Sequence, residues 1–326
     1  MSEESTLFEL QDVRKSFQTD GGTLKAVDGI TLQIRRGEVM GLVGESGCGK
    51  STLGRLLVRL YTPTEGDILF EGSSIRNLKR REAKEYTAKV QMIFQESYSS
   101  LNPRMTIGDS IKEGMRIHRM GTAAEIDRRM YELLEMVGLN ESHASRFPYE
   151  FSGGMRQRVG IARALAVNPR FIVCDEPISA QDVSIQSQIM NLLQRLHREL
   201  DLTYLFISHD LSAVRYMSDR IGVMYLGSLV ETAPAEELYI NPLHPYTQAL
   251  LSAVPKADPD AENKRERIVL EGDVPSPINI GEGCRFAGRC RFATEQCRST
   301  TPHLQEIGKD HAVACHRVRE HLSYQI

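Results

Sequence analysis

The chain has 326 residues, of which 41% are apolar and 25% are charged, and this length suits one large domain with a smaller one. Its net charge of −3 argues against nucleic-acid binding, for which a basic excess is typical. No segment approaches the roughly 20 apolar residues of a membrane-spanning helix, and residues 1–12 lack the apolar core of a secretory signal. We therefore expect a cytosolic protein, or one held at a membrane by partners.

A phosphate-binding loop is predicted in VMGLVGESGCGKST, residues 39–52, between an apolar strand and a helical pattern. The loop fits G-x-x-x-x-G-K-[ST], in which glycines let backbone N–H groups turn toward an anion at a helix N-terminus. Lys50 is expected to reach the β- and γ-phosphates, and the Ser51 hydroxyl to ligate Mg²⁺. Cys48 is at a position that the pattern leaves free, which favours a small filler residue. The predicted ATP-binding residues of this loop are Gly44, Ser46, Gly47, Cys48, Gly49, Lys50, Ser51 and Thr52.

A second anion-binding helix N-terminus is predicted in FSGGMRQRVGIARAL, residues 151–165. Ser152, Gly153 and Gly154 open this helix. One ATP cannot readily use both this N-terminus and the phosphate loop of the same chain. We therefore expect Ser152–Gly154 to contact an ATP bound by a partner subunit across a dimer interface.

Two further apolar strands are predicted to end in polar residues. In FIVCDEPISAQD, residues 171–182, Asp175 and Glu176 follow four apolar residues; in LTYLFISHD, His209 follows another strand. Because ligands bind at the carboxyl ends of parallel strands, these side chains are expected at one rim. Asp175 is predicted to hold Mg²⁺, Glu176 to polarise the attacking water, and His209 to contact the γ-phosphate.

These motifs, in this order, resemble those of the ATP-binding cassette (ABC) ATPases, whose signature is usually written L-S-G-G-Q. The resemblance covers residues 6–253 and implies an α/β nucleotide-binding domain over residues 1–253. Its expected parts are a P-loop core sheet, an antiparallel β region and a helical subdomain at about residues 96–160.

The resemblance also assigns roles to single residues. It implies that Phe17 stacks on adenine, and that Gln95 in VQMIFQES is the Q-loop glutamine, a catalytic residue and Mg²⁺ ligand beside Ser51 and Asp175. Residues 179–182 match the D-loop. Two departures are Met155, where the signature usually has glutamine, and Gln181, where the D-loop usually has leucine. Both are expected to face the partner subunit and to mark one of two unequal ATP sites.

Two phrases point to one branch of the family: SYSSLNPRMTIGDSI after Gln95, and YINPLHPYTQALLSAVP after the fold core. They resemble the ATPases of dipeptide, oligopeptide and nickel importers, and most closely the second ATPase of a dipeptide or oligopeptide system. The resemblance implies a paralogous ATPase partner, two permease subunits and, indirectly, an extracytoplasmic solute-binding protein. The expected location is the cytoplasmic face of the membrane, and residues 96–112 are expected to contact the permease. The alternatives are a soluble ABC-type switch ATPase without a permease, and an importer of nickel or another small solute.

Residues 254–326 are predicted to be a linker followed by a small module with four of the six cysteines. Cys284, Cys290, Cys297 and Cys315 are spaced C-x5-C-x6-C-x17-C, which suits either zinc or an iron–sulfur cluster. The gaps are wider than those of usual structural zinc sites. The resemblance to the peptide-importer family implies a [4Fe–4S] cluster, with zinc as the alternative and disulfides or free thiols as a third possibility.

Overall fold

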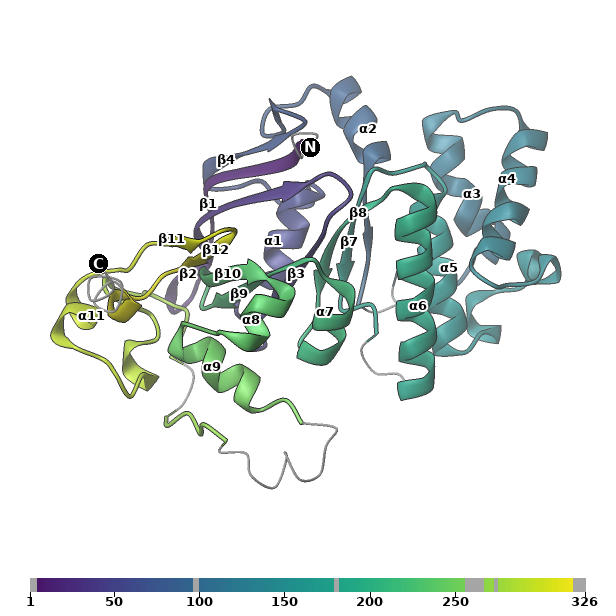
Figure 1. Ribbon diagram of the computed structural model, residues 1–326. Helices are drawn as coiled ribbons and strands as arrows, with labels where there is room; N and C mark the ends of the chain where they lie inside the picture. The colour runs from purple at the N-terminus through teal and green to yellow at the C-terminus, as the bar shows by residue number, and fades with distance from the viewer. Residues whose placement is uncertain (1–4, 96–99, 179–181, 256–266, 273–274, 319–326) are drawn as a thin grey trace.

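The computed structural model describes residues 5–95, 100–178, 182–255, 267–272 and 275–318 (Figure 1). Two sheets form the centre of the molecule, with helices packed against them. The predicted D-loop residues 179–181, including Gln181, and residues 96–99 of the segment after Gln95 lie outside the described residues.

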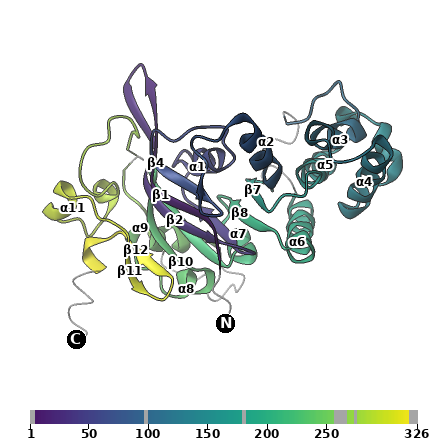
Figure 2. The same cartoon turned by 90° about the horizontal axis from the view of Figure 1, so that it is seen from above.

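The first sheet is antiparallel, in the order β2-β1-β4-β5. Its strands are β1 (Thr6–Thr19), β2 (Gly22–Arg35), β4 (Glu65–Phe70) and β5 (Ser73–Ser74). In β2 the buried residues Ile30, Leu32 and Ile34 alternate with exposed ones, so one face lies on the core and the other faces solvent. Figure 2 shows the β1–β2 hairpin projecting beyond the rest of this sheet.

The second sheet has the order β11-β12-β10-β9-β3-β8-β7-β6. The part from β9 to the edge strand β6 is parallel. Strands β3, β7 and β8 are buried along their whole length, as is usual for parallel strands covered by helices. The strands of this parallel part are β3 (Val39–Val43), β6 (Val90–Ile93), β7 (Phe171–Asp175), β8 (Thr203–Ile207) and β9 (Arg220–Tyr225). The helices that lie between these strands along the chain are α1 (Lys50–Leu57), α2 (Arg80–Lys89), α6 (Val183–Leu200) and α7 (Leu211–Met217).

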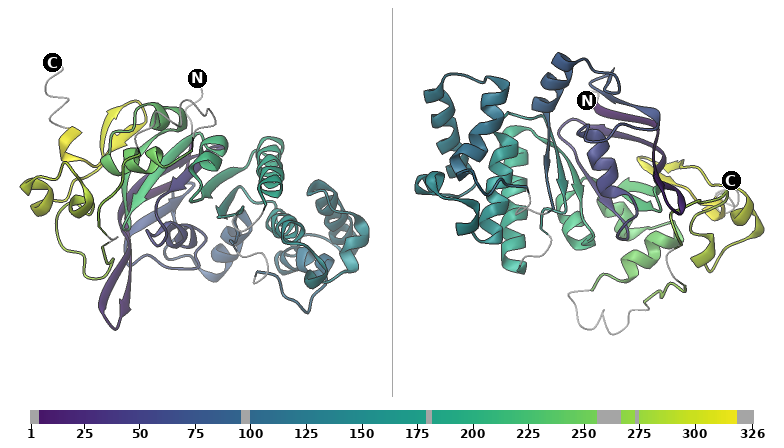
Figure 3. Two further views of the ribbon diagram at one scale, coloured as in Figure 1. Left: turned by 90° about the horizontal axis from the view of Figure 1, so that it is seen from below. Right: turned by 180° about the vertical axis from the view of Figure 1, so that it is seen from behind.

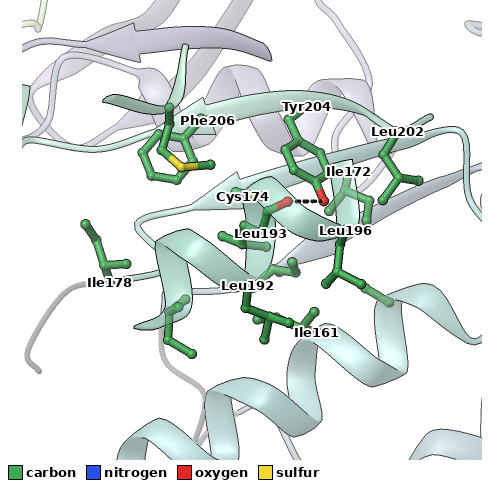
Figure 4. Close-up of a cluster of buried hydrophobic side chains, with 14 of the residues drawn as sticks. Ile161, Ile172, Cys174, Ile178, Leu192, Leu193, Leu196, Leu202, Tyr204 and Phe206 are labelled. Carbon is green, nitrogen blue, oxygen red and sulfur yellow. Dashed lines mark hydrogen bonds between the residues drawn. The ribbon is translucent and has the colours of Figure 1, made fainter. Parts of the chain in front are cut away.

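Strands β7 and β8 pack on α5 and α6 through an apolar layer, shown in Figure 4. Cys174 and Phe206 are fully buried in this layer, and the Tyr204 hydroxyl donates to the Leu193 carbonyl oxygen at 3.3 Å. This packing fixes the strand ends at which Asp175 and His209 lie, because a close-packed core resists small displacements.

A helical group follows β6 in the chain and lies at the opposite end of the molecule from the C-terminal segment (Figure 3). Its elements are α3 (Ile107–His118), α4 (Ala123–Met136), the 3₁₀ turns Glu141–Ser145 and Pro148–Glu150, and α5 (Gly153–Leu165). Thr106, Thr122 and Ser152 cap the three helices with side-chain oxygens that accept backbone N–H groups. Such a cap typically contributes about 1 kcal/mol.

The C-terminal segment is built onto the core sheet. After β10 (Ser228–Pro234), α8 (Ala235–Ile240) and α9 (Pro245–Ser252), the chain forms the 3₁₀ turn Ala287–Arg289, α11 (Glu295–Ser299), β11 (Gln305–Gly308) and β12 (His311–Val313). Strand β12 pairs with β10 in antiparallel register, Glu231 opposite Val313. The tail thereby covers what would otherwise be the open edge of β10. Among the described residues, no helix is long and apolar enough to cross a membrane.

Candidate ATP site and cysteine cavity

The phosphate loop connects β3 to α1, and its glycines are required by space as well as by backbone angle. A Cβ atom on Gly44 would lie 2.2 Å from the Met224 carbonyl oxygen, and one on Gly49 would lie 2.0 Å from the Ala26 carbonyl oxygen. Both glycines also have positive φ, 152° and 106°. The loop therefore passes too close to neighbouring backbone for any side chain at these positions.

Lys50 opens α1 and is only 5% exposed. Its ammonium group donates to the carbonyl oxygens of Gly44 at 2.8 Å and Glu45 at 3.0 Å, and lies 3.6 Å from the Cys48 sulfur. The cation is thus held inside the curve of the loop, where phosphate oxygens could replace the carbonyls as its partners. Burial raises the pKa of the Cys48 thiol above its usual value, in agreement with a small neutral filler.

Ser51 and Asp175 are brought together from α1 and the end of β7. The Ser51 hydroxyl donates to the Asp175 carboxylate at 2.7 Å. Burial raises the pKa of Asp175, and the hydrogen bond from Ser51 opposes that rise. A hydroxyl and a carboxylate together are oxygen ligands suited to Mg²⁺, which takes its remaining ligands from phosphates and water.

Glu176 lies one residue beyond β7 with a φ of 46°, a left-handed conformation that costs a non-glycine residue about 1–2 kcal/mol. Its carboxylate accepts a hydrogen bond from the Gln95 amide at 2.7 Å and lies 3.3 Å from Nδ1 of His209. The three residues predicted to be catalytic therefore meet at the carboxyl ends of β6, β7 and β8. Strain of this kind is typical of functional sites.

Phe17 lies near the end of β1, where its ring packs edge-on against Tyr61 with centroids 5.4 Å apart. The Lys15 ammonium lies 5.1 Å from the Phe17 ring centroid. Phe17 is partly buried. Its contact with adenine stays a prediction.

Ser152 caps α5, and its hydroxyl accepts from the Met155 N–H at 3.3 Å. Ser152 is exposed, and open space surrounds the Cβ position of Gly153, whereas Gly154 is buried. Met155 packs against the main core, so its departure from glutamine removes a polar group at a half-buried position. The helix start is exposed at Ser152, and its contact with the ATP of a partner subunit stays a prediction.

The four cysteines of the tail line one small cavity, together with Phe286 and the first residues of α9. All four are free thiols. Burial raises the pKa of Cys284 to about 11, and also raises the pKa values of Cys290 and Cys315. Within the described ranges, no three His, Cys, Asp or Glu side chains are close enough to hold a single metal ion.

Two residues outside the ATP loop contact Glu45 within it, and the motif predicts neither of them. The Glu45 N–H donates to the Tyr246 hydroxyl at 2.9 Å, and Arg289 forms an ion pair with the Glu45 carboxylate. The phrase HPYTQALL, which contains Tyr246, is the sequence signal that could have pointed to the first contact. The second joins positions 244 residues apart, and nothing local marks it.

Comparison with known proteins gives two family matches: residues 27–179 to the family described as ABC transporter, and residues 230–297 to the oligopeptide/dipeptide transporter C-terminal region. The chain is 55% identical over 317 residues to the putative oligopeptide transport ATP-binding protein YkfD of Bacillus subtilis, covering 96% of each chain. It is 59% identical over 282 residues to OppF of the same organism, an oligopeptide transport ATP-binding protein, covering 86% of this chain and 92% of OppF.

Among solved structures, the dimeric post-hydrolysis form of the ATP-binding cassette MJ0796 bound to ADP and Pi is similar, with 30% identity and a TM-score of 0.65. The match covers 70% of this chain and 99% of MJ0796. The predicted ABC-type α/β fold is thereby confirmed. The chain belongs to the ABC transporter ATPases and, within them, to the family of oligopeptide transport ATP-binding proteins.

Proposed function

We propose that this chain is the ATP-hydrolysing subunit of a membrane importer for dipeptides or oligopeptides. One arrangement supports ATP hydrolysis: the Glu176 carboxylate lies between Gln95 and His209, beside the Ser51–Asp175 pair. The assignment of a peptide substrate rests on the family match of residues 230–297 and on relatives named as oligopeptide transport proteins.

In the mechanism, Lys50 and the loop N–H groups bind the phosphates, while Ser51 and Asp175, with Gln95, would hold Mg²⁺. Bound Mg²⁺ would neutralise charge on the β- and γ-phosphates. Glu176 orients the attacking water, and His209 contacts the γ-phosphate. Most of the catalysis is positioning and electrostatic stabilisation, as is general for phosphoryl transfer.

The partners we propose are a paralogous ABC ATPase, two permease subunits and, indirectly, an extracytoplasmic binding protein. The exposed Ser152, with open space at the Cβ position of Gly153, supports the first, since these residues would contact the ATP of the paralogue. The proposed location is the cytoplasmic face of the membrane, through the permease.

Reconstitution tests this function. The chain, its paralogue and the permease subunits are placed in proteoliposomes with the solute-binding protein, and uptake of a labelled dipeptide, a pentapeptide and Ni²⁺ is compared. ATP-dependent peptide uptake that is lost in Glu176→Gln is expected. Uptake of Ni²⁺ alone would favour the nickel alternative, and failure to bind any permease would favour the soluble switch ATPase.

The permease contact can be mapped separately. Arg104 is exposed in the stretch 100–112 that follows Gln95, and Lys309 is exposed in the turn between β11 and β12. Cysteine at position 104 should cross-link to a cytoplasmic loop of the permease, whereas cysteine at position 309 should not. The reverse pattern would place the permease on the tail.

We further propose that Cys284, Cys290, Cys297 and Cys315 bind a [4Fe–4S] cluster. Support comes from their common cavity and free thiols. Four thiolates fit the ligand set of such a cluster. The C-x5-C-x6-C-x17-C gaps are wider than those of usual structural zinc sites, which favours the cluster over zinc.

Iron and acid-labile sulfide are measured on protein purified without oxygen. About four of each per chain are expected, with loss of both in Cys290→Ser and retention in Cys174→Ala, whose thiol lies in β7 far along the chain from the cavity. About one zinc and no sulfide would assign a Cys₄ zinc site. Oxidised thiols without metal would assign disulfides.

A further inference from the structure

Two arginines of the tail reach toward the nucleotide-binding end of the core. Arg289 Nη1 donates to both carboxylate oxygens of Glu45, at 3.1 and 3.0 Å. Arg285 donates to the Leu226 carbonyl oxygen and to the Asp28 carboxylate. The segment that carries the first two tail cysteines is thus attached by charge to the phosphate loop and to the strands beside it.

The Arg289–Glu45 pair is shielded from solvent. The Arg289 side chain is 9% exposed and that of Glu45 is 25% exposed. Screening by salt is weaker for such a pair than for an exposed one. Arg289 Nε is buried without a hydrogen-bond partner among the described residues, and the same guanidinium lies near the Tyr225 hydroxyl as well as the Glu45 carboxylate.

Glu45 adds a negative charge to a loop that must bind negative phosphates. Its carbonyl oxygen lies 3.0 Å from the Lys50 ammonium, so the residue is next to the cation that should hold the phosphates. Its N–H is held by the buried Tyr246 hydroxyl, which leaves its backbone little freedom to move away. Without a counter-charge, the Glu45 carboxylate would oppose ATP binding through poorly screened repulsion.

We propose that Arg289 is a positioning residue for ATP binding, which neutralises Glu45 and keeps its carboxylate on the tail side of the phosphate loop. Arg289 contacts neither ATP nor Mg²⁺; it acts through Glu45. ATP affinity therefore depends on the C-terminal segment. The inference needs only the ATPase activity of the family, and it holds whichever group the four thiols bind.

The test uses the full chain in its assembled complex, with KM for ATP and kcat measured separately and fluorescent-nucleotide binding as a second readout. Arg289→Ala should raise KM about fivefold while kcat stays within about twofold, an effect in the range of coupled charged neighbours. Arg289→Lys should give an intermediate KM, because it keeps the charge but loses the two-oxygen contact. The matched control is Arg291→Ala, an exposed arginine that packs on the neighbouring Phe292 ring.

Removing the carboxylate separates charge neutralisation from a packing role. In the Glu45→Gln background, Arg289→Ala should change KM by less than about twofold, because no charge is left to neutralise. The same fivefold rise in that background would overturn the proposal, and so would an unchanged KM in Arg289→Ala alone. Thermal unfolding of each variant shows whether a raised KM comes from misfolding. If it does, the Glu45→Gln substitution would not restore the KM of Arg289→Ala.

Discussion

At the residue scale, binding the phosphates and activating water are assigned to different side chains. Lys50 is buried within the curve of its loop, whereas Glu176 lies on a strained backbone between an amide and an imidazole. Their substitutions should therefore have different kinetic consequences.

Lys50→Ala is expected to abolish ATP binding, because the phosphates lose their cation. Glu176→Gln should retain ATP binding and lower turnover by about 100-fold or more, the scale of losing a general base. Nucleotide binding and ATP hydrolysis by the assembled complex are the measurements, with Lys309→Ala as an exposed lysine control. Full turnover in Glu176→Gln would remove this residue from its proposed role and point to the partner's site.

At the element scale, Glu71 connects the two sheets. It follows β4, and its carboxylate accepts from Arg36 at 2.6 Å, from Lys89 at 3.1 Å and from Arg170, which precedes β7. Burial alone would raise the pKa of Glu71, but these hydrogen bonds outweigh it and lower the pKa to about 2. The ionised form is therefore favoured in the folded protein.

The lowered pKa predicts a stability term that is full above about pH 4.5 and is lost as the pH falls toward about 2. Glu71→Gln should lower the free energy of unfolding by about 2 kcal/mol at pH 7, and the difference should shrink steadily below pH 4.5. Urea unfolding at several pH values measures it. Glu65→Gln is the control, since its side chain is 70% exposed and its ion pair is 3.7 Å long. An equal loss at pH 7 and pH 3 would contradict the electrostatic account.

Elements that carry local signals could be predicted from the sequence. The strands ending at Val43 and Asp175 and the helix starting at Gly153 were predicted because an apolar run or a glycine motif marks each. The pairing of β12 with β10 was not predictable, because the two are about 80 residues apart and short strands carry little register information. Likewise, the motifs indicated Lys50 and Glu176 but not the distant Arg289.

At the scale of the whole molecule, the C-terminal segment contributes to the core as well as to the cysteine cavity. Glu231 in β10 is fully buried and accepts from the N–H groups of Leu243 and His244 at 2.8 and 3.0 Å. Its third contact is Nε2 of His311, at 2.9 Å, from β12. A buried carboxylate of the ATPase core is thus satisfied partly by the tail, so the two parts should unfold together.

His311→Ala should lower the free energy of unfolding by about 3 kcal/mol, because removing one partner of a buried pair leaves the other uncompensated. Asp310→Ala is the matched control, because it removes the neighbouring ion pair with Arg35. The Arg35 side chain is 29% exposed and that of Asp310 is 24% exposed, so this change should lower the free energy of unfolding by less than about 1 kcal/mol. Denaturant unfolding of the full chain, followed in the far ultraviolet, measures both. A single cooperative transition shifted in His311→Ala is expected, since β12 belongs to the same sheet as β3, the strand that leads into the phosphate loop. A separate early transition that leaves the main transition unshifted would show that the tail is an independent module. Glu231 would then have to find another partner once the tail has unfolded.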